Sequence, residues 1–227
     1  MSAQPSAGSR TGADPAEGHA AGLAVAADGQ ILVRRAASTD RDELSKMFAR
    51  CTLQTRYRRF HAPVKAIPER YLAEALTASP FHYALVACPV PPDTDLAATD
   101  LAAARDMDAR SGGIVALASC RVVEEGMAEV GILVEDAWQR RGVGSALLDE
   151  LAAHARAIGL RALTAQLLTE QAWTAGMLAR YGPVKRSLAS RGVVTVTVPL
   201  APGEGVGEAP AGPRLSCRPA ATRSASA

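Results

Sequence analysis

Two arginines and two glycines stand together in residues 139–144, Gln-Arg-Arg-Gly-Val-Gly, at the start of an amphipathic segment. Gly142 and Gly144 have no Cβ, so another molecule can approach their backbone closely. The first N–H groups of a helix have no intrahelical partner, and the helix dipole adds positive potential there. Together with the charges of Arg140 and Arg141, these groups have the chemistry of a site for a phosphate or pyrophosphate.

Other readings of this stretch stay open on spacing alone. A dinucleotide-binding turn needs Gly-x-Gly-x-x-Gly, and a Walker loop needs a lysine followed by serine or threonine; neither pattern is complete here. A plain tight turn between a strand and a helix also accounts for the glycines. A nucleotide-binding protein would be indicated by tight ATP or NAD binding.

The stretch resembles the acyl-CoA pyrophosphate loop of the GNAT superfamily of N-acyltransferases. That motif is Gln/Arg-x-x-Gly-x-Gly/Ala, placed after a strand and at the start of a helix, and residues 139–144 match it throughout. The similarity in element order extends over residues 31–200. Residues 54–65, 128–130 and 180–182 are similar, in particular, to the catalytic domain of bacterial protein-lysine acetyltransferases.

The resemblance implies that acetyl-CoA is the co-substrate and that no metal takes part. In this family two neighbouring strands splay apart, the pantetheine arm pairs with the exposed strand backbone, and the loop and helix start hold the pyrophosphate. The implied binding residues are Gly131, Ile132, Leu133, Val134, Gln139, Arg140, Arg141, Gly142, Val143, Gly144, Ser145 and Gln171.

Glu129 is the catalytic residue that the resemblance implies, as general base. Strand alternation places it on one face of residues 127–135 together with Gly131 and Leu133. A lysine amine has a pKa of about 10.4, so its neutral form costs roughly 4.6 kcal/mol at pH 7. A positioned base typically accelerates such a reaction about 10²–10⁴-fold. We expect a strand N–H near Leu133 to stabilise the oxyanion.

The sequence departs from the family at two positions. Gln171 stands where many relatives carry an asparagine that touches CoA, and Leu178 stands where many carry a tyrosine that protonates the leaving thiolate. Tyr181, three residues further, is an alternative general acid, and water is another. Because of these changes, a non-catalytic acyl-CoA-binding regulatory module of the same fold is a second hypothesis.

Weaker candidates surround the motif. Arg56, Arg58 and Arg59 are expected to form a charged helix face, although they could line the acceptor or CoA site. His61 and His82 are expected to be structural. The resemblance to the protein-lysine acetyltransferases leads us to expect lysine side chains of proteins as the acceptor, with small-molecule amines as the alternative. We expect the protein to be a monomer or a homodimer.

Helical and strand periodicities alternate along the chain, so the fold class is mixed α/β, with a mostly antiparallel sheet of six to seven strands flanked by helices. The long helix 142–158 carries an apolar stripe and ends at Gly159. Predicted strands are 31–35, 82–88, 114–123, 127–135, 160–168 and 193–200, and the other predicted helices are 40–50, 53–60, 68–78 and 170–181.

The ends of the chain differ in composition from its middle. Residues 1–29 and 201–227 are rich in Ala, Gly, Ser and Pro, and are predicted to be disordered tails around one domain, residues 30–200. Residues 89–113 combine prolines, alanines and aspartates, and are predicted to be an exposed excursion between two strands. This excursion is a candidate for acceptor selection.

Composition excludes several classes of protein. With 227 residues, a net charge of +2 and ordinary apolar content, the chain is neither disordered throughout nor basic enough for typical nucleic-acid binding. No apolar run approaches the roughly 18 residues of a membrane helix. The four cysteines do not have the spacing of a metal site or of a redox dithiol. Scattered cysteines and the lack of an apolar leader lead us to expect a cytoplasmic protein.

Overall fold

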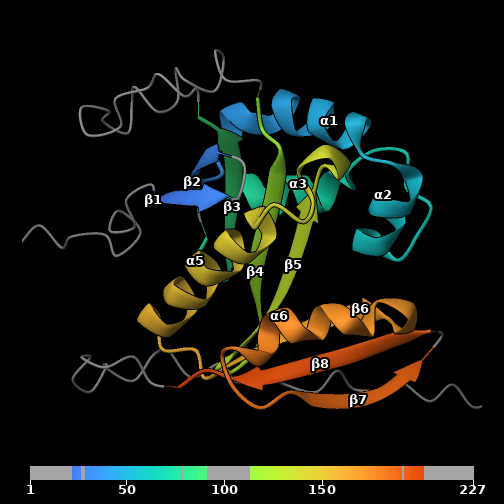
Figure 1. Ribbon diagram of the computed structural model, residues 1–227. Coiled ribbons are helices and arrows are strands. Elements are labelled where there is room, and N and C mark those ends of the chain that lie inside the picture. Colours follow the sequence, from blue (N-terminus) through green and yellow to red (C-terminus); the bar gives the residue numbers. More distant parts are fainter. Residues whose placement is uncertain (1–21, 27–28, 78, 91–112, 191, 202–227) are drawn as a thin grey trace, which may run out of the picture.

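The computed structural model describes residues 22–26, 29–77, 79–90, 113–190 and 192–201. In those residues one eight-stranded sheet has the order β1-β2-β3-β4-β5-β6-β8-β7 (Figure 1). Neighbouring strands are antiparallel except β5 and β6, which are parallel. The strands are β1 (Gly22–Ala26), β2 (Gly29–Arg35), β3 (His82–Pro89), β4 (Ala116–Glu124), β5 (Met127–Val134), β6 (Ala162–Leu168), β7 (Lys185–Ser190) and β8 (Val193–Pro199). The mixed α/β class with a mostly antiparallel sheet is confirmed.

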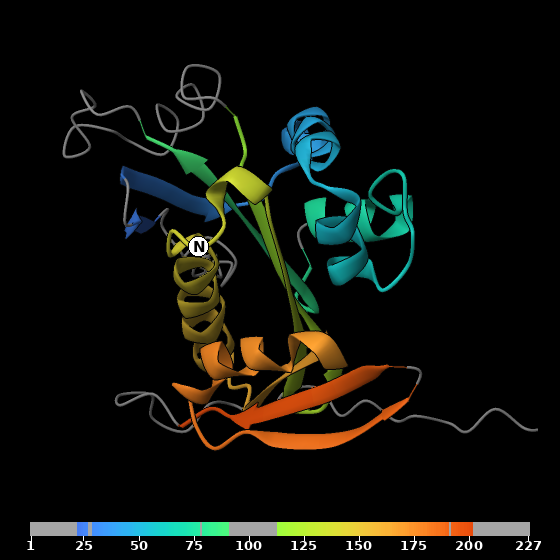
Figure 2. The ribbon, with the colours of Figure 1, turned by 45° about the vertical axis from the view of Figure 1, so that its right-hand side comes forward.

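Helices cover both faces of this sheet. Figure 2 shows α5 on one side and α1, α2 and α3 on the other, while β8 and β7 run across one end. The α-helices are α1 (Arg41–Arg50), α2 (Leu53–Phe60), α3 (Glu69–Leu76), α5 (Val143–Ala157) and α6 (Ala175–Ala179). Short 3-10 turns, η2 (Ser38–Asp40), η4 (Asp136–Trp138) and η5 (Thr169–Thr174), precede α1, α5 and α6 respectively.

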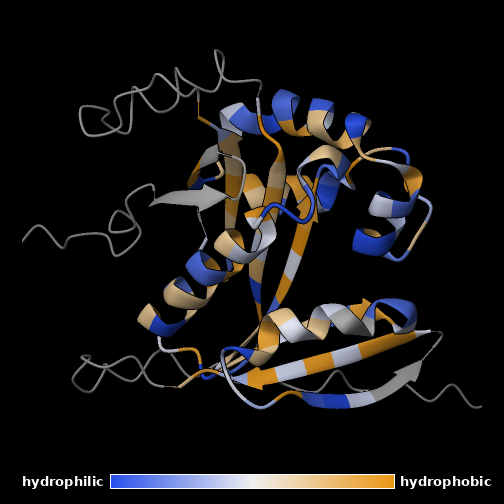
Figure 3. Ribbon diagram, viewed as in Figure 1, coloured by the Kyte–Doolittle hydropathy of each residue, from blue (hydrophilic) through white to orange (hydrophobic). Residues whose placement is uncertain are grey.

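Two apolar cores lie on the two faces, and β3 contributes to both. Its alternate side chains Leu85 and Ala87 belong to the core under α5, whereas Val86 and Cys88 belong to the core under α1 and α3. Successive residues of a strand point to opposite faces, so a strand covered on both sides is apolar throughout. Figure 3 shows mostly apolar colouring along β3, whereas β4 and β5 are interrupted by polar residues.

Two strands were absent from the sequence prediction. β1 pairs with β2 in antiparallel register, so the predicted tail 1–29 is wrong for residues 22–26. β7 pairs with β8 at the other edge of the sheet. Both segments lack the β-branched and aromatic runs that mark a strand, and their pairing to a neighbour supplies the backbone hydrogen bonds instead.

The remaining boundaries shift by a few residues. The predicted helix 170–181 is divided into η5 and α6, because residues 169–174 adopt the tighter 3-10 form. Most of the predicted excursion, residues 91–112, and the predicted tails except residues 22–26, 29 and 201 lie outside the described residues. Within the described part, no helix is long and apolar enough to cross a membrane.

Candidate active site

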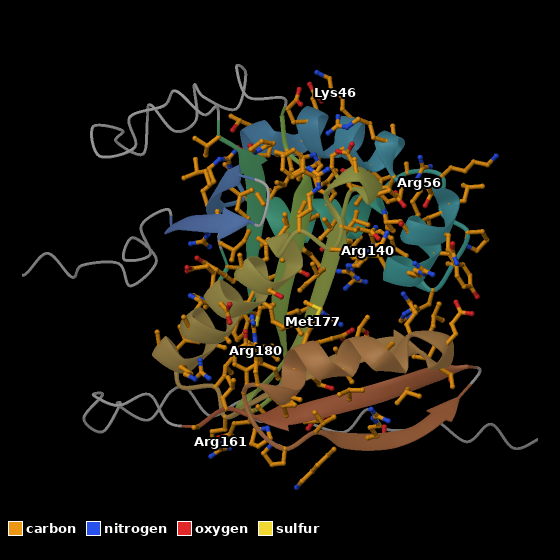
Figure 4. All side chains as sticks on the ribbon, viewed as in Figure 1. Lys46, Arg56, Arg140, Arg161, Met177 and Arg180 are labelled. Atoms are coloured by element: carbon orange, nitrogen blue, oxygen red, sulfur yellow. The ribbon has the colours of Figure 1, made fainter. Side chains whose placement is uncertain are left out.

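A cavity opens where β5 and β6 part. The two strands pair only from Met127–Ala162 to Glu129–Thr164, and beyond Glu129 they diverge. The space between them, closed by α2, α6 and the start of α5, measures about 520 Å³. Figure 4 shows Met177 extending from α6 towards β5, on the side where Arg140 lies. The strand splay implied by the family resemblance is therefore present.

The backbone of β5 offers its free groups to this cavity at alternate residues. The Glu135 N–H donates to the Val115 carbonyl at 2.9 Å, so Glu135 faces β4. Backbone groups alternate sides along a strand, which directs those of Leu133 to β4 and those of Ile132 and Val134 into the cavity. Of the strand N–H groups near Leu133, where the oxyanion donor was expected, the Leu133 N–H itself is directed to β4 and the adjacent Ile132 N–H faces the cavity.

The loop before α5 holds an unusual backbone conformation. Arg140 has φ of 60° and Gly142 has φ of 89°, both in the left-handed region that favours glycine. The first hydrogen bond of α5 runs from the Ala146 N–H to the Gly142 carbonyl at 3.0 Å, and no side chain caps this end. The N–H groups of residues 143–145 therefore precede the helix ladder and face the end where an anion is favoured.

The structure brings the predicted site residues together with two exceptions. Arg141 and Val143 do not line the cavity. The Arg141 guanidinium lies over the Trp138 ring, 5.2 Å from its centroid, and Val143 is buried in the core under α5. The predicted residues that line the cavity are Glu129, Gly131, Ile132, Leu133, Val134, Gln139, Arg140, Gly142, Gly144, Ser145 and Gln171.

Gln139 connects three parts of the cavity wall. Its side-chain Nε2 donates to the Val134 carbonyl at 3.0 Å and to the Thr55 hydroxyl at 3.1 Å. It thereby ties the loop to β5 and to α2. The side-chain amide hydrogens of Gln139 are therefore used in positioning the loop.

Glu129 lies in the wall at the point where the strands separate. Its side chain is 28% exposed, and a carboxylate oxygen forms an ion pair with the Arg121 guanidinium at 3.1 Å. Arg121 is the residue directly opposite on β4, so the pair spans neighbouring strands. The cavity therefore contains a carboxylate held in one orientation beside the free backbone of β5.

The side of the cavity formed by α2 is positively charged. Sequence analysis expected the arginines of this helix to form a charged helix face, with the cavity wall as the alternative. Arg58, Arg59 and His61 all line the cavity, whereas Arg56 does not. The Arg56 guanidinium donates to the Cys51 carbonyl at 3.0 Å and lies over the Phe48 ring. Burial, together with the nearby Arg59 charge, lowers the pKa of His61 below its ordinary value.

Asp136 fixes α2 against the loop after β5. Its carboxylate accepts the Thr52 N–H at 2.8 Å, the Thr52 hydroxyl at 2.9 Å and the Thr55 hydroxyl at 2.8 Å. Burial opposes the charged form, but these hydrogen bonds lower the pKa of Asp136 below its usual value. Thr52 is the N-cap of α2, a signal that was readable from sequence, but its partner 84 residues away was not.

The lining also includes residues of β6, η5 and α6 that sequence analysis did not single out. They follow from the splay, which turns one face of β6 towards β5. These residues are Ala165, Gln166, Leu167, Thr174 and Met177.

Tyrosine is absent from the lining residues that the structure describes. Leu178, at the position of the family tyrosine, is buried beside the cavity. The Tyr181 hydroxyl instead donates to the Asp149 carboxylate on α5. Burial and this hydrogen bond raise the pKa of Tyr181 to about 12. The structure therefore gives no support to Tyr181 as an acid in the cavity.

Metal ligands do not gather in this site. Over the described ranges of the chain, no group of three or more His, Cys, Asp or Glu side chains could hold a metal ion. The three cysteines within those ranges, Cys51, Cys88 and Cys120, are buried and form no disulfide with one another. Burial raises the pKa of Cys120 to about 12, which keeps that thiol protonated and unreactive.

Comparison with known proteins agrees with this geometry. The model of the Acetyltransferase (GNAT) family matches residues 72–182, which include β3 to β6, α5 and α6. No curated protein matches the chain.

Solved structures share the fold. The GNAT domain of S. lividans PAT is 25% identical, with a TM-score of 0.62, over 79% of this chain and 97% of that domain. A domain from Methanocaldococcus jannaschii is 14% identical, with a TM-score of 0.54, over 75% and 98% of the two chains. A GNAT acetyltransferase from Streptococcus pneumoniae is 18% identical, with a TM-score of 0.50, over 75% and 99%. Residues 72–182 of this chain therefore match the Acetyltransferase (GNAT) family, and the described fold is similar to that of the GNAT domain of S. lividans PAT.

Proposed function

We propose that this protein is an acetyl-CoA-dependent N-acetyltransferase that acetylates lysine side chains of proteins, with Glu129 as the general base. One observation carries the proposal. The Glu129 carboxylate lines the cavity where β5 leaves β6, beside the backbone groups of Ile132 and Val134 that point into the same space. A base and free strand groups thus meet at one place.

The residues around the cavity fit acetyl-CoA, which supplies the acetyl group as a thioester. The Ile132 N–H and carbonyl and the Val134 N–H face the cavity and can pair with the amides of the pantetheine arm, whereas the Val134 carbonyl already accepts the Gln139 side chain. The N–H groups at the start of α5 and the Arg140 guanidinium, which lines the cavity, suit the pyrophosphate. Gly142 and Gly144 leave room for its close approach.

Glu129 acts on the acceptor amine. Its carboxylate removes the proton that the amine must lose, so that the nitrogen can bond to the acetyl carbon while the carbon–sulfur bond breaks. The acylated nitrogen then releases its second proton, and the departing thiolate takes up a proton through water, since the described lining includes no tyrosine. The Ile132 N–H, directed into the cavity, is the donor we assign to the carbonyl oxygen during this step.

The similarity to S. lividans PAT favours protein lysine as the acceptor of this chain. PAT of S. lividans is a protein acetyltransferase, and its GNAT domain aligns over most of this chain. Small-molecule amines are the competing acceptors. A binding module without catalysis is the competing function, which Leu178 in place of tyrosine favours.

Labelled acetyl-CoA tests the proposal. Wild-type protein, Glu129→Gln and the control Glu125→Gln, which changes an exposed carboxylate in the turn after β4, are incubated with a cell extract. We expect label in protein lysines, a rate lower by about 10²–10⁴-fold for Glu129→Gln, and an unchanged rate for the control. Acetyl-CoA affinity, measured by calorimetry, should be the same in all three.

Other outcomes decide between the alternatives. Label only in small molecules would replace protein lysine by a small amine as acceptor. Acetyl-CoA binding without transfer to any amine would establish the binding module. Equal rates for Glu129→Gln and wild type would remove Glu129 from the mechanism.

A further inference from the structure

Arg59 occupies the space that the missing side chain of Gly131 leaves. A Cβ placed on Gly131 would lie 2.5 Å from the Arg59 Cζ, so the guanidinium rests directly on the strand backbone. Gly131 and Glu129 are two residues apart on the same face of β5, a spacing of roughly 7 Å along the strand. A cation therefore lies in the cavity close to the proposed general base.

This cation is held in place without being neutralised. The Arg59 Cζ lies 5.0 Å from the centroid of the Phe60 ring and 4.9 Å from that of Tyr71. Nη2 donates to the Ser119 hydroxyl at 3.4 Å, and Nε is buried without a hydrogen-bond partner. Among the described residues, no carboxylate forms an ion pair with Arg59.

The described lining of the cavity as a whole carries more positive than negative charge. Arg58 and Arg140 also line it, and neither forms an ion pair within the described part of the chain. Glu129 is the lining carboxylate there, and Arg121 already pairs with it. Arg140 lies at the loop assigned to the pyrophosphate, which leaves Arg58 and Arg59 on the α2 side. An acceptor that brought only an amine would leave these two charges without a partner.

We propose that the acceptor carries a carboxylate next to its reactive amine and that Arg59 binds this carboxylate. The inference rests on the proposed acetyl transfer and specifies its substrate class. A planar guanidinium packed against two rings presents N–H groups in the geometry that a carboxylate accepts. The carboxylate can come from an acidic residue flanking a peptide lysine or from the α-carboxylate of a free amino acid.

Matched acceptors test this assignment. The first pair is acetyl-Gly-Glu-Lys-Glu-Gly-amide and its counterpart with Gln in place of both Glu; the second pair is free lysine and lysinamide. Transfer from acetyl-CoA gives kcat/KM, and calorimetry in the presence of CoA gives binding without chemistry. We expect the carboxylate-bearing member of one pair to be favoured about tenfold in both measurements.

Variants connect the preference to Arg59. In Arg59→Gln the ratio within the favoured pair should fall to about one, while Arg59→Lys, which keeps the charge, should retain part of it. The control Arg70→Gln removes a charge from a side chain that is 93% exposed on α3, and should keep the full ratio. The variant Arg59→Gln should bind acetyl-CoA as wild type does.

Three results would overturn the inference. They are equal binding of both members of each pair by wild type, a preference that survives in Arg59→Gln, and loss of acetyl-CoA binding in that variant. Binding is measured separately from transfer, so a protein that binds the acidic peptide without acetylating it would contradict the proposed function and leave the carboxylate site standing. Preference within the first pair identifies peptides as the source, and preference within the second identifies amino acids.

Discussion

At the scale of single residues, the absence of a side chain at one position of β5 decides where a cation lies in the cavity. Gly131 has no side chain, and for that reason the Arg59 guanidinium can lie on β5 beside Glu129. Sequence analysis assigned Gly131 to backbone contact with pantetheine, but its backbone groups face β4, as those of Leu133 do. In the structure, Gly131 instead leaves space on β5 for the Arg59 side chain of α2.

Gly131→Ala should therefore change specificity more than stability. The added Cβ would displace the guanidinium, which is the end of a flexible side chain, so we expect the free energy of unfolding to change by less than about 1 kcal/mol. The preference for carboxylate-bearing acceptors should be lost. Urea unfolding and the peptide-pair assay measure the two effects.

Gly176→Ala is the control for this substitution. A Cβ at Gly176 would meet nothing within 4 Å, and alanine favours a helix over glycine by about 0.5–1 kcal/mol. We expect slightly higher stability and an unchanged acceptor preference. Retention of the preference in Gly131→Ala would show that Arg59 binds the acceptor from another position or does not bind it.

At the scale of elements, the site depends on how α2 is attached. Its N-terminal turn is tied through Thr52 and Thr55 to Asp136, which follows β5 directly, and through Thr55 to Gln139. The helix that carries Arg58, Arg59 and His61 is thus fixed to the strand and loop on the opposite side of the cavity. Movement of α2 would alter the acceptor side without touching α5.

Asp136→Ala should loosen this attachment. It removes three acceptor contacts at a helix N-terminus, and we expect a loss of about 1–2 kcal/mol in the free energy of unfolding. KM for the acceptor should rise more than the Kd for acetyl-CoA. Urea unfolding and steady-state kinetics measure these changes.

Glu125→Ala serves as the comparison for Asp136→Ala, since it removes an exposed carboxylate from the turn after β4. Its stability should stay within about 0.5 kcal/mol of wild type. If Asp136→Ala were equally harmless in stability and in KM, the three hydrogen bonds would contribute nothing to placing α2.

At the scale of the whole molecule, one sheet separates two cores. The core under α5 continues to α6 and β8, whereas the core under α1 and α3 ends at β5. The cavity lies where the second core stops, between α2 and α6. One edge of the sheet is β1, which also packs against α5.

Removal of β1 should weaken this edge. We compare a chain that begins at residue 22 with one that begins at residue 29. The shorter chain loses the five-residue ladder to β2, and we expect it to be less stable by about 2 kcal/mol because several net hydrogen bonds of about 0.5–1.5 kcal/mol disappear. Thermal and urea unfolding of both chains give the difference, and equal stability would show that β1 adds nothing to the fold.

The sequence by itself determined the class of fold, most strand and helix positions, and the group of cavity residues on β5 and the loop before α5. These features are local. A period of two or 3.6 residues marks an element, and glycines at a helix start mark an anion site within six consecutive residues. The edge strands β1 and β7 were not predicted, because they are maintained by backbone pairing with a neighbouring strand and not by a side-chain pattern.

Only the tertiary structure decided which side chains face the acceptor. The placement of Arg59 against Gly131 joins residues 72 positions apart, and the ties of Asp136 to α2 span more than 80. It also decided which backbone groups of β5 are free, because that depends on the register with β4. Such contacts follow from packing of distant elements, and no local pattern of residues encodes the direction in which a long charged side chain points.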